Sequence, residues 1–295
     1  MTEQMKGVVM TTIGVLAIVP DSLLIRMIDA EIPVIAFWRS GFAGVVLLAT
    51  VLLIYRRNAV GVVVRLRWSG AIYTVLMACA TLLFVVAIEM TSVASTVFIV
   101  STAPVFSAII SRLFLGERIT GRMVWTIILS LVGVGVIAFG SVGEPAGQIL
   151  GKLAALGVAL CLSASYTAAR SARPFSMVPA AALSQLVLAT TLLVFVEPWG
   201  LDRTSWIYAV LLGGFLVPLG AGLLAVGPRY ITAAEVSLLL LLEAALAPVL
   251  VWLVLGEVPT AWVLAGGVFL LTVLAVSNWA GFREARQLVR ASGRS

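Results

Sequence analysis

Residues 115–120 read Leu-Gly-Glu-Arg-Ile-Thr, and residues 255–260, which lie 140 positions later, read Leu-Gly-Glu-Val-Pro-Thr. The preceding segments align at the same offset without a gap, so that Thr-Ser-Val-Ala-Ser at 91–95 falls on Ile-Thr-Ala-Ala-Glu at 231–235. This match indicates that the chain is a duplication. We therefore predict two repeats, over residues 1–141 and residues 142–295.

The composition places both repeats in a membrane. Of the 295 residues, 62% are hydrophobic and 11% are charged, whereas soluble domains are usually ~45–50% apolar and ~25% charged. A helix needs about 20 apolar residues to cross a bilayer, and the sequence offers ten such runs. We expect spans near residues 7–26, 33–54, 70–90, 93–114, 123–140, 150–170, 178–196, 205–227, 233–254 and 261–281. The predicted fold class is an all-α membrane protein with ten transmembrane helices.

The basic residues predict how these spans are oriented. With ten spans, both termini lie on one side of the membrane, and fifteen of the 19 Lys and Arg residues fall in segments on that side. Three fall on the opposite side, and Arg39 lies within a span. Because loops rich in Lys and Arg stay in the cytoplasm, we expect a protein of the inner membrane with both termini cytoplasmic.

The odd number of spans in each repeat bears on function. Two five-span copies in one chain must have opposite orientations in the membrane. Inverted repeats of this kind place a substrate site near the midplane, where the copies meet, and expose it to one side at a time. The sequence therefore predicts a transporter that works by alternating access.

Several function classes are disfavoured by what the sequence lacks. Histidine is absent, which excludes histidine-based proton relays and histidine zinc ligands. The two cysteines form no C-x-x-C motif, and no phosphate-binding loop or G-x-S-x-G elbow is present. We expect no metal, no cofactor and no enzymatic activity. An intramembrane enzyme, with a Ser or Thr nucleophile beside Glu243, is the remote alternative.

Longer stretches carry a family resemblance. Residues 87–137, with Ala103-Pro104 in mid-helix, resemble the EamA-type repeat of the drug/metabolite transporter superfamily. Residues 231–276 resemble its partner repeat, and residues 21–39 resemble the opening of the first repeat. The resemblance implies a ten-helix exporter of small metabolites, with the first, third, fourth, sixth, eighth and ninth helices around a central cavity. Bacterial amino-acid exporters, including the aromatic amino-acid type, are similar.

Three ionisable residues inside predicted spans are candidate site residues, because each such group costs about 2.5–3.5 kcal/mol to insert. Asp21 and Arg39 both lie ~8–9 Å from the outer end of their spans. They are expected to pair, either to pin two helices together or to act in gating or in holding the ends of a zwitterion. Glu243 lies ~15 Å into its span. It either binds an ammonium group or a coupling proton, or packs through a hydrogen bond to a Ser or a backbone carbonyl.

Other candidates are polar or aromatic residues at similar depth and prolines within spans. An apolar or aromatic ligand is typically held by such walls, although each residue taken singly also suits an ordinary core. The candidate wall residues are Tyr73, Phe84, Phe98, Ser101, Ser163 and Tyr166. The candidate hinges are Pro20, Pro104, Pro218 and Pro248; at 243–244 the chain has Glu-Ala where the family commonly has Glu-Pro, so Pro248 is expected to bend the ninth helix instead. The Gly-Glu pairs at 116–117 and 256–257 are predicted to end helices.

Taken together, these features predict a secondary transporter that exports small metabolites, with amino acids as the favoured substrates. The alternative within the superfamily is efflux of drugs or other cationic compounds, for which Glu243 would supply the binding charge. The expected partners are a small-molecule substrate and the lipid bilayer, with no nucleic acid. Because both repeats lie in one chain, we expect a working monomer.

Overall fold

The computed structural model describes residues 3–116, 121–139, 146–171, 175–226, 230 and 233–292. All regular secondary structure in these ranges is helical. The α-helices are α1 (Glu3–Ile18), α2 (Asp21–Met27), α3 (Ile32–Tyr55), α4 (Ala59–Arg65), α5 (Arg67–Met90), α6 (Val93–Val100), α7 (Ala103–Leu115), α8 (Gly121–Phe139), α9 (Ala146–Ser171), α10 (Val178–Leu192), α11 (Arg203–Leu211), α12 (Val217–Val226), α13 (Ala233–Leu255) and α14 (Ala261–Ser292). A 3-10 turn, η1 (Arg56–Asn58), precedes α4, and a π-helical turn, η2 (Leu212–Leu216), joins α11 to α12.

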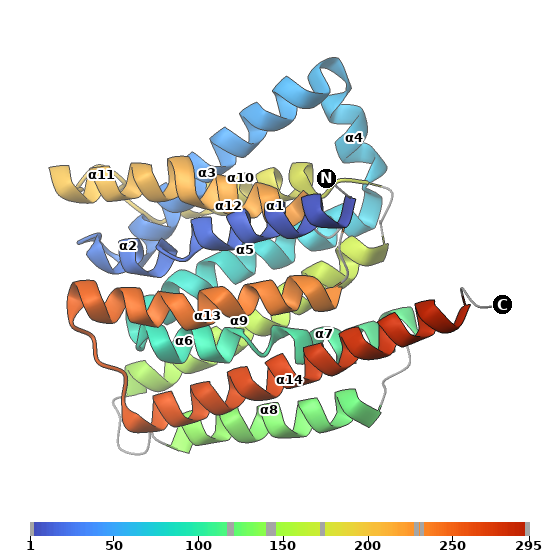
Figure 1. Cartoon of the computed structure of the whole chain (residues 1–295). Helices are drawn as coiled ribbons and strands as arrows, with labels where there is room; N and C mark the ends of the chain where they lie inside the picture. The colour runs from blue at the N-terminus through green and yellow to red at the C-terminus, as the bar shows by residue number, and fades with distance from the viewer. Residues whose placement is uncertain are drawn as a thin grey trace.

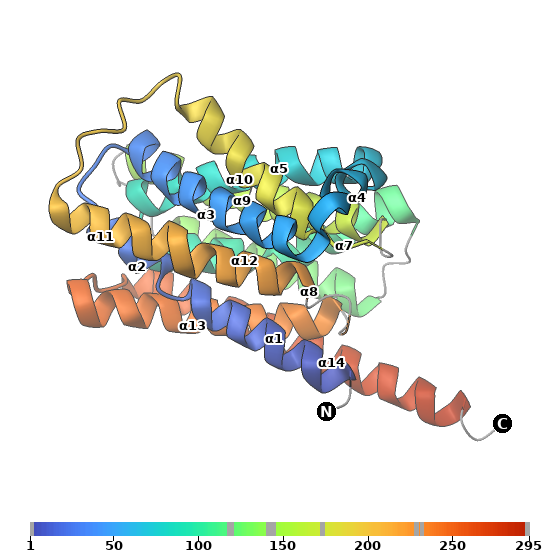
Figure 2. The same cartoon turned by 90° about the horizontal axis from the view of Figure 1, so that it is seen from above.

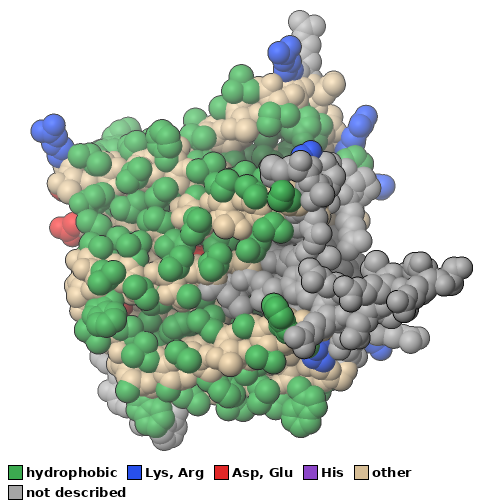
Figure 3. Space-filling model, viewed as in Figure 1, with side chains coloured by type: hydrophobic (Ala, Val, Ile, Leu, Met, Phe, Trp, Pro, Cys, Tyr) green, Lys and Arg blue, Asp and Glu red, His purple; other side chains and the backbone are tan. Residues whose placement is uncertain are grey.

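Six helical segments are long and apolar enough to cross a membrane: Met5–Met27, Ile32–Tyr55, Arg67–Met90, Val93–Phe114, Gly147–Ala169 and Arg203–Val226. Shorter apolar helices lie at Val124–Ile137, Val178–Leu192, Leu242–Leu255 and Ala261–Ser277. Six of the ten predicted spans match the long segments, and the other four overlap the shorter apolar helices. Large hydrophobic side chains are exposed along the flanks, whereas Lys and Arg side chains lie toward the ends (Figure 3). The protein is therefore a helical, multi-pass membrane protein.

The long helices run alongside one another in a bundle (Figures 1 and 2). In the bundle, α5 packs along α9, α10 along α3, and α14 along α8. The start of α1 and the end of α14 point to the same side of the bundle (Figure 1). Apolar residues cover the outside of the bundle as well as its interior. The buried core is formed largely by small and β-branched side chains, which allow the helices to pack closely.

The fourth predicted span is interrupted between α6 and α7. Pro104 is near the start of α7 and has no backbone N–H, so it cannot continue the hydrogen-bond ladder of α6. At the break, the Ser101 hydroxyl donates a hydrogen bond to the Phe98 carbonyl at 2.7 Å, and the Thr102 hydroxyl donates one to the Ile99 carbonyl at 2.6 Å. These hydroxyls satisfy carbonyls beside the break, which is what allows a discontinuous helix within a membrane.

Two other predicted spans are irregular as well. Pro20 separates α1 from α2 and accepts a hydrogen bond from the Leu24 N–H at 3.0 Å. The π-helical turn η2 interrupts the eighth span just before Pro218, and its Gly213 packs so tightly on α3 that a Cβ would lie 2.7 Å from the carbonyl oxygen of Arg39. By contrast, α13 is continuous through Pro248. The ninth span therefore does not break as the fourth does.

The N-terminus of α11 offers a test of pH dependence. The Asp202 carboxylate caps this helix, and hydrogen bonds from the Ser205 side chain, and then from the backbone N–H groups of Ser205 and Thr204, hold the pKa of Asp202 below its ordinary value of 3.8. A carboxylate with a lowered pKa contributes stability above its ordinary pKa and loses it as the pH falls through the folded-state pKa. We expect α11 to loosen at its first turn only in acid.

Thermal unfolding in detergent between pH 3 and pH 7 would measure this. Asp202→Asn is the matched control, because Asn also caps helices well but does not titrate. The variant should lose part of the acid-induced decrease in melting temperature that the wild type shows. An identical pH dependence in the two proteins would contradict the prediction.

Candidate functional site

A cavity of about 180 Å³ lies inside the helix bundle. Its walls come from α1 and α2, α5, α6 and α7, α9, α12, and α13, which correspond to the first, third, fourth, sixth, eighth and ninth predicted spans. These are the helices that the sequence resemblance implied. Arg39 of α3 and Gln185 of α10 complete the described lining. Both breaks at Pro20 and Pro104 lie beside this cavity, so the irregular backbone borders the space that a ligand would fill.

One side of the cavity carries a buried ion pair. Arg39 donates from Nε to Asp21 Oδ1 at 3.0 Å and from Nη2 to Asp21 Oδ2 at 2.5 Å, and both side chains are almost fully buried. The predicted pairing of these two residues is therefore confirmed. The remaining guanidinium nitrogen, Arg39 Nη1, is buried without a hydrogen-bond partner. The guanidinium carbon lies 5.9 Å from the centre of the Phe84 ring. The pair thus leaves one N–H donor group of a cavity-lining residue without a partner.

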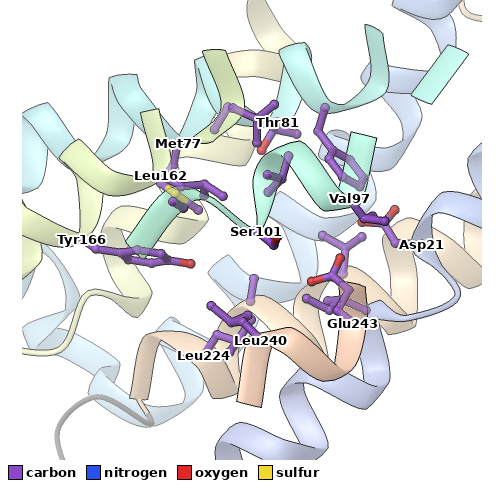
Figure 4. Close-up of a pocket in the computed structure, with 18 of the residues that line it drawn as sticks. Asp21, Met77, Thr81, Val97, Ser101, Leu162, Tyr166, Leu224, Leu240 and Glu243 are labelled. Carbon is purple, nitrogen blue, oxygen red and sulfur yellow. The ribbon is translucent and has the colours of Figure 1, made fainter. Parts of the chain in front are cut away.

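Glu243 lines the same cavity from α13. Figure 4 shows the Glu243 carboxylate on the same side of the cavity as Asp21, and Ser101 between Glu243 and Tyr166. Among the residues that the structure describes, no side chain or backbone group donates a hydrogen bond to this carboxylate. The packing role expected through a Ser or a backbone carbonyl is thus not what the structure shows. The carboxylate faces space that a ligand can occupy.

The aromatic and hydroxyl candidates divide into two groups. Tyr73, Phe84, Ser101 and Tyr166 line the cavity, and the Tyr166 ring points toward Ser101 from across it (Figure 4). Ser163 is fully buried and donates instead to the backbone carbonyls of Ala103 and Ala159, both at 2.6 Å. Its hydroxyl therefore supports the start of α7 rather than a ligand.

Phe98 does not line the cavity either, because its ring turns toward α14. It packs over Gly267, where a Cβ would overlap the ring atoms Cδ2 and Cε2.

We expect Gly267→Ala to lower the free energy of unfolding by about 1–3 kcal/mol through overpacking. Thermal unfolding measures the change. Gly135→Ala on the neighbouring α8, where no atom lies within 4 Å of the new Cβ, is the control and should be neutral or stabilising; equal effects at both sites would contradict the prediction.

Two polar lining residues were missed by the sequence reasoning. Gln185 donates from Nε2 to the Thr81 hydroxyl oxygen at 3.3 Å, and both residues are buried at the cavity wall. The sequence did contain a signal for Gln185, because it is the only glutamine inside a predicted span. The candidates were ionisable, aromatic, serine and proline residues, so this amide was overlooked. Elsewhere, no group of three or more Cys, Asp or Glu side chains in the described ranges is arranged to hold a metal ion.

The glycines of both Gly-Glu pairs end helices as predicted. Gly116 and Gly256 have left-handed φ angles of 68° and 70° after α7 and α13. Glu257 then accepts a hydrogen bond from the Val93 N–H of α6 at 3.0 Å and lies 3.6 Å from Arg26. Arg26 also donates to the Thr91 carbonyl at 2.7 Å. This network joins α2, the turn before α6 and the segment after α13 at one end of the bundle; Glu117 lies outside the described residues.

Glu257→Ala should therefore lower the free energy of unfolding by about 1 kcal/mol, mainly through the lost cap of α6, since partly exposed ion pairs contribute little. Glu257→Gln keeps an oxygen that can accept from Val93 and should cost less. Melting temperatures of the two variants in detergent would check the order. A larger loss for Gln than for Ala would contradict the capping role.

The cavity is lined by discontinuous helices and carries charged groups, a combination that is common in membrane transporters. The sequence model of the EamA-like transporter family matches residues 5–139 and again residues 149–279. The chain belongs to the EamA-like transporter family, and it is a multi-pass membrane protein.

Individual relatives agree with this assignment. The "Uncharacterized transporter YdfC" of Bacillus subtilis (strain 168) is 32% identical over 177 residues, an alignment that covers 58% of this chain and 57% of the relative. The chain thus spans little more than half the length of this curated relative. A solved crystal structure of 17% sequence identity matches with a TM-score of 0.66, over 96% of this chain and 98% of the other. At that identity, the match shows the shared fold alone.

Proposed function

We propose that the protein exports amino acids across the inner membrane by alternating access. The working unit is ten transmembrane helices in two inverted five-helix repeats, residues 1–141 and 142–295, with both termini in the cytoplasm. The two separate matches to one family model support the duplication, and the distribution of Lys and Arg supports the orientation. Because each repeat contributes to the cavity, a monomer is sufficient.

The observation that carries the amino-acid assignment is that one cavity is lined by a guanidinium with a nitrogen that lacks a partner and by a second carboxylate outside the ion pair. Arg39 Nη1 has no partner and can donate to a carboxylate. The Glu243 carboxylate can accept from an ammonium group. Tyr73, Phe84 and Tyr166 provide apolar wall for a side chain, and Ser101 provides a hydroxyl between the two ends. A zwitterion with an apolar or aromatic side chain satisfies all of these groups at once.

The interrupted helices supply the movement. Pro20 and Pro104 lie at breaks beside the cavity, and Pro218 follows the π-helical turn η2. Backbone at such positions is held by fewer hydrogen bonds than a continuous helix, so it changes conformation at lower cost. We assign these three prolines to hinges, and Pro248 to a fourth within the continuous α13.

A second candidate is efflux of organic cations. The cavity lining contains two carboxylates, Asp21 and Glu243, against one guanidinium. With both carboxylates ionised, the site carries one net negative charge and attracts a cation. In this reading, Arg39 only neutralises Asp21 and makes no contact with the ligand.

Counterflow of radiolabelled substrates into proteoliposomes of the purified protein separates the two candidates. The panel contains amino acids and hydrophobic cations, and each is measured with and without a pH gradient. Saturable amino-acid flux that a second amino acid competes away supports the proposal. Cation flux without any amino-acid flux overturns it in favour of the second candidate. Dependence on the gradient shows proton coupling, for which Glu243 and Asp21 are the candidate carriers.

A further inference from the structure

The unexplained polar group in the cavity is the Gln185 side chain. It comes from α10, a helix that contributes no other described residue to the lining. The residue is only 4% exposed. Its amide nitrogen donates to Thr81, while its carbonyl oxygen Oε1 is buried without a hydrogen-bond partner. A buried acceptor without a donor lowers the stability of a protein by about as much as a lost hydrogen bond. Since buried polar groups are usually paired, this oxygen calls for a donor on a bound molecule.

A series of contacts through α5 connects Gln185 to Arg39, the residue assigned to the substrate carboxylate. Thr81, which holds the amide, is three residues from Phe84 on α5, or ~4.5 Å along the helix axis. The Phe84 ring in turn lies 5.9 Å from the guanidinium carbon of Arg39. Gln185, Thr81, Phe84 and Arg39 thus line one continuous part of the cavity wall. A substrate whose carboxylate is bound at Arg39 would place its side chain in the same cavity.

We propose that Gln185 is a specificity-determining residue whose Oε1 accepts a hydrogen bond from an O–H or N–H group on the substrate side chain. This inference rests on the proposed amino-acid transport and adds the side-chain class. Aromatic side chains with a donor, a phenol or an indole, fit the surrounding apolar walls of Met77, Leu162 and Tyr166. Thr81 is a positioning residue, because it holds the Gln185 amide at the cavity wall.

Competition between matched substrates tests the proposal in the wild-type protein without any variant. One pair is tyrosine and phenylalanine, which differ by the phenolic O–H. The other pair is tryptophan and 3-(3-benzothienyl)alanine, in which sulfur replaces the indole N–H. A site built to bind a donor rejects an analogue that lacks it. We expect each donor-bearing member to inhibit counterflow at a concentration lower by at least about tenfold.

Gln185→Leu then assigns the preference to this residue. The variant should bring both inhibition ratios close to one while phenylalanine and the benzothienyl analogue bind at least as well as before, which also shows that the variant is folded. Thr81→Val should weaken the preference without abolishing it. Ser184→Ala is the matched control, because the Ser184 hydroxyl bonds to the Ala181 carbonyl and lies outside the cavity lining.

The outcomes separate this inference from the function on which it rests. Wild-type flux of amino acids with no preference for donor-bearing members, or a preference that survives in Gln185→Leu, overturns the role of Gln185 and leaves amino-acid transport standing. An opposite preference, for phenylalanine over tyrosine, overturns it as well. Absence of any amino-acid flux overturns the proposed function and the side-chain assignment together.

Discussion

Replacing Arg39 with Met is expected to lower the free energy of unfolding by about 3–5 kcal/mol, because it leaves the Asp21 carboxylate buried without its partner. The effect is large for two reasons. Both side chains are nearly inaccessible, and the two hydrogen bonds between them are the polar contacts that the structure records for the Asp21 oxygens. Thermal unfolding in detergent and the yield of monodisperse protein would measure the loss.

The double variant Asp21→Leu with Arg39→Met separates stability from transport. Replacing both members of a buried pair with apolar residues is often neutral or stabilising, so the double variant should recover the stability that Arg39→Met loses. It should not recover amino-acid counterflow, because the free Nη1 donor is gone. Recovery of both properties would show that the pair only pins α2 to α3 and makes no contact with the substrate.

The sequence was sufficient to predict the ion pair and to single out Pro104, where the fourth span proves to be broken. Asp21 and Arg39 lie at similar depths in consecutive spans, and an unpaired charge at that depth is costly, so each needs the other. Pro104 cannot continue a helix. Both inferences depend on chemistry that is local in the chain or fixed by distance from the membrane surface.

The direction of a side chain around its helix axis was harder to predict. Phe98 and Ser101 lie one turn apart in the same span, yet only Ser101 reaches the cavity. The Phe98 ring is drawn to α14 because Gly267, 169 positions later, leaves room for it. Ser163 is likewise engaged by a carbonyl of α7 across a helix contact. Such partners depend on which helices become neighbours, and in an apolar span the hydrophobic pattern does not single out one face.

The continuity of α13 through Pro248 depends on neighbouring groups in the same way. A proline inside a helix removes one hydrogen bond, but whether the helix also breaks depends on groups that satisfy the freed carbonyls. Beside Pro104, the hydroxyls of Ser101 and Thr102 donate to the Phe98 and Ile99 carbonyls at the end of α6. The four residues before Pro248 are Ala, Ala, Leu and Ala, and none has a hydroxyl. The helix α13 accordingly stays continuous.

Replacing Glu243 with Gln should reduce amino-acid counterflow by about 30-fold or more, because losing the charge that pairs with a buried ammonium group typically costs 2 kcal/mol or more. The variant keeps the size of the side chain and removes only its charge and its titrating proton. Because no described group hydrogen-bonds to the carboxylate and a neutral amide is easier to bury than a charge, the melting temperature should be unchanged or higher. A loss of transport with no loss of stability would assign Glu243 to the ligand rather than to packing.

Truncated competitors locate the contact within the substrate. A carboxylic acid that lacks the ammonium group should inhibit wild type and Glu243→Gln equally, since it never reaches Glu243, whereas the intact amino acid should discriminate between them. An amine that lacks the carboxylate should be sensitive to Glu243→Gln but insensitive to the double variant at positions 21 and 39. If the carboxylic acid loses affinity in Glu243→Gln to the same extent as the amino acid, Glu243 acts on the shape of the whole cavity and the two-ended binding of a zwitterion is wrong.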